Sequence, residues 1–106
     1  MPYTRLTNDR EDPNYEASAE DLMVLGATIS EVALIYLIPK GQLTIAKKLA
    51  KEVMQLNHVA HRGDASKIGK LWRKYAKQYN FMLNDGPDDI WMNVKLTIMD
   101  KAGIEP

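Results

Sequence analysis

The sequence contains no cysteine, and this absence removes several classes of protein at once. Disulfide-stabilised scaffolds, thiolate-bound zinc sites, iron–sulfur clusters and thiol catalysis all require cysteine. Nothing in the composition indicates an oxidising compartment, so we expect a cytoplasmic protein. The first residues, Met1–Arg5, are not followed by an apolar run, and we therefore expect no secretory signal.

A membrane-spanning segment is not expected either. The most apolar stretch, Leu22–Ile38, is slightly short for a membrane span and carries Glu31 near its middle. A charge at that depth is costly in lipid. We therefore expect this stretch to form a buried helix, and we predict no membrane partner.

Sequence motifs that carry catalysis are absent as well. The chain has no glycine-rich phosphate loop, no nucleophile elbow and no Ser/His/Asp set. His58 and His61, with Asp64 just beyond, could place two imidazoles on one helical face for a metal, but no third ligand is evident. Histidines near a helix C-terminus are also favoured simply by the helix dipole. We predict a protein that is not an enzyme, with no catalytic residues, no cofactor and no bound metal.

What the sequence does contain is typical of one small globular domain. Its 106 residues are 45% hydrophobic and 26% charged, which is close to globular averages. Residues 1–17 are polar, include Pro2 and Pro13, and show no periodicity, so they are predicted to form an extended acidic arm. Residues 18–106 are predicted to fold as a single helical bundle domain.

Apolar side chains recur every three or four residues through most of this domain, as in helices that pack on a core. The pattern predicts long helices over residues 18–37, 42–61 and 65–83. Ser18 and Asp64 are the expected N-caps of the first and third of these helices. The breaks between them are short, which favours neighbouring helices that run in opposite directions.

The final segment, residues 88–102, is ambiguous. Alternating apolar residues from Ile90 to Ile98 follow a strand pattern. The acidic residues at its start, and Gly103 followed by Ile104 at its end, instead suit a helix that closes with a Schellman motif. Because no other segment offers a strand partner, we predict a helix. The predicted fold class is all-α: an antiparallel bundle of three long helices plus a shorter C-terminal helix, with an extended N-terminal arm.

The net charge is zero, but the charges are unevenly distributed. Residues 1–38 carry −5, residues 39–83 carry +8 and residues 84–106 carry −3. Lysines spaced by three and four residues give the third helix one positive face, which fits a phosphate backbone, an acidic partner or plain solvation. The candidate basic binding face consists of Arg62, Lys67, Lys70, Arg73, Lys74 and Lys77. The aromatic residues of this helix occupy core positions, so we expect them to fill the core rather than to stack on bases.

The first helix carries more apolar surface than one core-facing stripe. Residues 32–38 contain no polar residue apart from Tyr36, so this run must be enclosed by the bundle or covered by a partner. Met23, Leu34 and Leu37 face away from the main stripe and are predicted to form a protein interface. The favoured function is non-catalytic binding to a protein partner, by an accessory, regulatory or inhibitor-like protein that self-associates. The alternative is nucleic-acid binding through the basic face.

Overall fold

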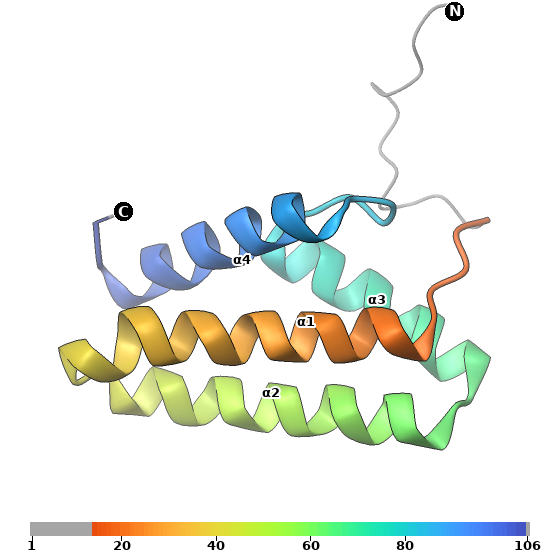
Figure 1. The fold of residues 1–106 in the computed structure, drawn as a ribbon, viewed down its shortest axis with the longest axis horizontal. Coiled ribbons are helices and arrows are strands. Elements are labelled where there is room, and N and C mark those ends of the chain that lie inside the picture. The colour runs from red at the N-terminus through yellow and green to blue at the C-terminus, as the bar shows by residue number, and fades with distance from the viewer. Residues whose placement is uncertain (1–13, 106) are drawn as a thin grey trace, which may run out of the picture.

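The computed structural model describes residues 14–105, which form four α-helices and no strand (Figure 1). The all-helical class predicted from the sequence is confirmed. The elements are α1 (Ala19–Val32), η3 (Ala33–Leu37), η4 (Ile38–Lys40), α2 (Leu43–Arg62), α3 (Ala65–Tyr79) and α4 (Pro87–Ala102). Residues 1–13 of the predicted arm lie outside the described residues.

α1 begins with the capping box expected at Ser18. The Ser18 hydroxyl accepts a hydrogen bond from the Asp21 amide at 3.2 Å, and the Asp21 carboxylate accepts one from the Ser18 amide at 2.9 Å. The same carboxylate accepts a hydrogen bond from the Tyr15 hydroxyl at 3.2 Å. These contacts satisfy amides that the first helical turn leaves free, and they fix the segment ahead of α1.

The end of the first helix is wider than a regular α-helix. Residues Ala33–Leu37 form the π turn η3, in which the amide of Ile38 donates to the carbonyl of Ala33, and the single 3₁₀ turn η4 follows. Pro39 lies in η4 and has no amide hydrogen with which to continue α-helical bonding. Gly41 then adopts a φ of 72°, a left-handed value that suits glycine, and the chain turns back into α2.

α1 is the central helix of the domain. α2 lies alongside it, α4 lies along its other side, and α3 passes behind it in the view of Figure 1. The side chains of Leu22, Leu25, Ile29 and Val32 have no exposed surface. By length and composition the continuous helical segment Ala19–Lys40, whose most apolar 18-residue stretch has a mean hydropathy of 1.9, would suffice to cross a membrane. The central helices of water-soluble proteins share this property.

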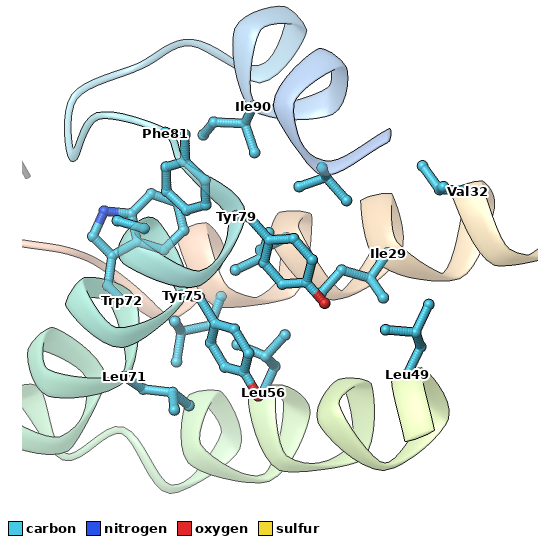
Figure 2. Close-up of a cluster of buried hydrophobic side chains, with 14 of the residues drawn as sticks. Ile29, Val32, Leu49, Leu56, Leu71, Trp72, Tyr75, Tyr79, Phe81 and Ile90 are labelled. Carbon is cyan, nitrogen blue, oxygen red and sulfur yellow. The ribbon is translucent and has the colours of Figure 1, made fainter. Parts of the chain in front are cut away.

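The core lies where α3 covers the junction of α1 with its two neighbours (Figure 2). Tyr75 and Tyr79 extend from α3 into this junction, Tyr75 toward Leu56 of α2 and Tyr79 toward Ile29 of α1. The two tyrosine rings are stacked with centroids 6.0 Å apart. Tyr75 and Tyr79, which the sequence pattern assigned to the core, are therefore core residues.

Helix α3 ends four residues earlier than predicted. Asn80 has a φ of 60°, a left-handed conformation that closes the helix after Tyr79. Phe81 and Leu83 are nevertheless buried, because the Phe81 ring packs 5.0 Å from that of Trp72 and the Leu83 carbonyl accepts a 3.1 Å hydrogen bond from the Trp72 indole. The apolar pattern beyond residue 79 therefore belongs to a buried loop and not to further helical turns.

The ambiguous final segment is a helix, as predicted. It ends in the expected Schellman motif, in which Gly103 has a φ of 69° and the amide of Ile104 donates to the carbonyl of Met99 at 2.9 Å. α4 has 16 residues and α3 has 15, so the expectation of a shorter fourth helix is wrong. The physical reason is that Asn80 shortens α3, while Pro87 provides a favourable first residue for α4.

Substitution of Gly26 tests the contact between α1 and α2. A Cβ atom at this buried position would lie 3.5 Å from Val53 Cγ1 and 3.5 Å from Asn57 Oδ1, which are ordinary contact distances. Alanine favours a helix over glycine by about 1 kcal/mol, so we expect Gly26→Ala to raise the free energy of unfolding by about 0.5–1 kcal/mol in urea denaturation. Gly63→Ala is the control, and it should lower stability because the φ of 73° at that position is strained for alanine. A loss of stability in Gly26→Ala would contradict the contact described.

Candidate interaction surfaces

An apolar groove of about 270 Å³ runs between α1 and α2. Its lining residues are Ile29, Ser30, Ala33, Leu34, Ile38, Ala46, Leu49, Ala50 and Val53. On α2, Glu52 and Gln55 make hydrogen bonds to α3, whereas Ala46 and Ala50 lie on a different side of the helix by its 3.6-residue repeat. The groove therefore opens on the face of the α1–α2 pair that α3 leaves uncovered.

Large exposed apolar side chains border this groove. Leu34 is 62% exposed and Ile38 is 45% exposed on its wall. Met23 of α1, 57% exposed, lies on the stripe that leads to Leu34 of η3. Met54, 70% exposed, follows the lining residue Ala50 by one helical turn. We define the groove face as the groove together with the exposed side chains of Met23, Leu34, Ile38, Leu43 and Met54.

Two of the three interface residues predicted from the sequence, Met23 and Leu34, lie on the groove face. Leu37 is fully buried, so the prediction that it is exposed at an interface is wrong. The cause is the π turn, whose hydrogen bonds join residues five apart and which brings Leu37 onto the core face that also holds Val32. Ile38 occupies the outer position in its place.

The half of the groove face that belongs to α2 was not predicted from the sequence. Met54 stands outside the apolar stripe of its helix, and small residues precede it at Ala46 and Ala50. A large apolar residue off the stripe, next to small ones, is the signal that could have indicated a second contact face.

The two helices that form the groove carry charges of opposite sign. The acidic residues of α1 are Glu20, Asp21 and Glu31, and this helix has no basic residue. The basic residues of α2 are Lys47, Lys48, Lys51 and Arg62, against the single acid Glu52. Glu31 accepts a 2.6 Å hydrogen bond from the Trp91 indole on α4, and the Lys95 ammonium lies 5.6 Å from the centroid of that ring. The α1 helix is therefore acidic and the α2 helix basic.

The predicted basic binding face is exposed, with one exception. The exposed members are Arg62, Lys67, Lys70, Lys74 and Lys77. Arg73 is half-buried, and its guanidinium donates to the carbonyl of Gly69 at 3.2 Å and to the carbonyl of Tyr15 at 3.3 Å. Arg73 therefore attaches the segment ahead of α1 to α3 and does not widen the open basic face.

The aromatic side chains of α3 are not available for stacking on bases. Trp72, Tyr75 and Tyr79 are all buried, which confirms that they fill the core. The Lys74 ammonium lies 5.5 Å from the Tyr75 ring centroid, at the edge of that core. The basic face thus offers cations without stacking platforms, and its contacts with an anion would be electrostatic.

A polar hollow of about 330 Å³ lies at the corner between α2 and α3. It is lined by His58, Val59, Arg62, Asp64 and Lys67. The Asp64 carboxylate accepts hydrogen bonds from the amides of Ser66 at 3.0 Å and Lys67 at 3.2 Å, so it is the N-cap of α3, as predicted. Within residues 14–105, no group of three or more His, Cys, Asp or Glu side chains is placed to hold a metal ion.

A hydrogen-bonded group of polar side chains joins α2 to α3. The Glu52 carboxylate accepts hydrogen bonds from the Tyr79 hydroxyl at 2.5 Å and from the side-chain amide of Gln78 at 2.9 Å. The Tyr75 hydroxyl donates to the side-chain oxygen of Gln55 at 3.3 Å. Burial, and after it the Glu52 carboxylate, raises the pKa of Tyr75 to about 12. Burial and the hydrogen bond to Glu52 also raise the pKa of Tyr79. Because both oxygens of Glu52 are occupied, we interpret the group as a structural connection between the two helices.

Comparison with protein-family models, with curated protein sequences and with solved structures found no match for this chain. The surfaces described above are therefore the basis for inferring its function.

The tyrosine pKa values predict how stability depends on alkaline pH. Tyrosines in the unfolded chain ionise near pH 10, whereas the raised pKa keeps Tyr75 protonated in the fold, so the folded state binds more protons above about pH 10. The free energy of unfolding should therefore fall as the pH rises from about 10 to about 12. Tyr75→Phe should show a smaller fall than the unmodified protein in urea denaturation over this range. Equal falls in the two proteins would contradict the assignment.

Proposed function

We propose that this chain is a non-catalytic, protein-binding helical bundle, with neighbouring helices antiparallel, that self-associates through the groove face. The proposal includes the accessory, regulatory or inhibitor-like role and the cytoplasmic setting expected from the sequence. The observation that carries it is the cluster of large exposed apolar side chains on one face of the α1–α2 pair. Contiguous apolar surface of this kind marks interaction sites in soluble proteins.

The energetics favour a covered groove face. Burying a leucine, isoleucine or methionine side chain that was in water contributes about 1.5–3 kcal/mol. The groove face offers five such side chains at 45% exposure or more, set around a hollow that can receive a partner's side chain. A partner that covers this face therefore removes several apolar side chains from water at once.

A second candidate function is nucleic-acid binding through the basic face. It is supported by the exposed lysines that follow one stripe of α3 from Lys67 to Lys77. Such a row could release condensed counterions from a phosphate backbone. The burial of the α3 aromatic residues removes the base-stacking contribution, so this candidate ranks below protein binding.

Sedimentation tests the first proposal directly. We expect the protein to sediment at a multiple of its 12.0 kDa chain mass, and Leu34→Glu to shift it toward the monomer, because a buried unpaired carboxylate is costly at an interface. Leu96→Glu is the matched control, since Leu96 is 41% exposed on α4 and lies outside the groove face. A monomer at every accessible concentration would contradict self-association. Dissociation by Leu96→Glu but not by Leu34→Glu would contradict the assigned face.

Titration with labelled nucleic acid separates the two candidates. On the protein-binding proposal, fluorescently labelled DNA and RNA should not bind even at low salt. Binding that weakens log-linearly with salt, and that the double substitution Lys70→Glu with Lys74→Glu abolishes, would establish the alternative. The double substitution Lys48→Glu with Lys101→Glu, at exposed positions outside α3 and the groove face, is the control for a general loss of positive charge.

A further inference from the structure

We propose that the occupant of the groove face is a second copy of this chain, placed so that α1 of each copy packs on α2 of the other. The two α1 helices and the two α2 helices then form a four-helix arrangement whose twofold axis runs parallel to the helices. The inference rests on the proposed function and adds the identity and the orientation of the partner.

Side-chain size is complementary between the two helices. The contacts of Gly26 with Val53 and Asn57, and the shared lining of the groove by Ser30 and Ala50, show which turns of α1 and α2 lie level with each other. On the same alignment the large Leu34 of η3, the turn that continues α1, is level with the small Ala46 of α2.

About two helical turns from Leu34, toward the start of α1, the sizes are reversed. Met54 of α2 is level with the small Ala27 of α1, which follows the contact residue Gly26. A twofold axis parallel to the helices places each turn of α1 opposite the level turn of α2 in the partner. Leu34 then meets Ala46 of the other copy, and Met54 meets Ala27, so that large side chains enter positions lined by small ones, as in knobs-into-holes packing.

Charge selects this orientation over the other face-to-face twofold arrangement. With an axis across the helices, α1 would lie on α1 and α2 on α2, which opposes acid to acid and lysine to lysine. With the axis along the helices, Glu31 comes level with the turn that holds Lys47 and Lys51 of the other copy, and Glu20 comes level with Arg62. Opposite charges at the rim favour the correct register and suppress the alternative.

Helix direction supports the same choice. α2 runs opposite to α1 within one copy, and rotation about an axis parallel to the helices preserves each helix direction. Every helix in the four-helix arrangement therefore lies between two antiparallel neighbours, which is the common topology of such bundles. The contact uses the same surface on both copies, so it closes into a dimer and does not extend into a filament.

The absence of cysteine makes this arrangement directly testable by disulfide cross-linking. Ser30→Cys and Ala50→Cys are made in separate chains, so that any disulfide between positions 30 and 50 must join two copies. We expect the mixture of the two variants to form a cross-linked dimer under mild oxidation. Each variant alone should cross-link at least about tenfold more slowly, because its two thiols would lie on diagonally opposed helices, beyond the roughly 7 Å limit between Cα atoms.

A register control uses the same surface. Ser30→Cys mixed with His61→Cys should cross-link poorly, because position 61 lies three turns from position 50, about 16 Å along α2. Cross-linking of Ser30→Cys with itself as readily as with Ala50→Cys would overturn the proposed orientation while leaving self-association in place. A monomer in sedimentation, with no cross-linking in any mixture, would overturn the orientation and self-association together.

Discussion

Helix α1 is apolar over most of its circumference, and a helix of this kind needs a neighbour on every side. The rest of the domain supplies three: α2 and α4 along its flanks, and α3 across one face. Four core side chains of α1 are completely enclosed in this way, while Leu34 and Met23 on the remaining side stay in water. The excess of apolar surface on one helix, which the other described elements leave partly uncovered, connects the fold to the proposed function.

The position of α3 decides which side of α1 stays open. Glu52 holds Tyr79 and Gln78 of α3 through short hydrogen bonds, so α3 is fixed to one side of α2. Ala46 and Ala50, on another side of the same helix, are left to line the groove. The polar connection and the groove are thus two consequences of one packing arrangement, because a helix anchored on one face of the α1–α2 pair cannot cover the other.

Much of the fold follows from local sequence signals. The capping box at Ser18, the N-cap Asp64 and the Schellman ending at Gly103 were all predictable, because each depends on a few neighbouring residues. Leu37 was not, since the π turn ahead of Pro39 changes the repeat that assigns residues to faces. The hydrogen bonds of Arg73 were equally hidden, because one of them joins residues 58 positions apart in the chain. At the candidate site, the periodicity of the sequence indicated which faces of single helices carry apolar residues. The groove itself depends on how α1, α2 and α3 pack together.

In the proposed dimer, a partner copy covers the groove face. The most direct measurement is peroxide oxidation of methionines, followed by mass spectrometry over a range of protein concentrations. Met92 provides an internal reference, because it is 47% exposed on α4, away from the groove face. If the dimer forms in this way, Met23 and Met54, although more exposed than Met92 in the single chain, should oxidise more slowly than Met92 at high concentration and lose this protection on dilution. Oxidation of Met23 and Met54 at least as fast as that of Met92 at every concentration would contradict it.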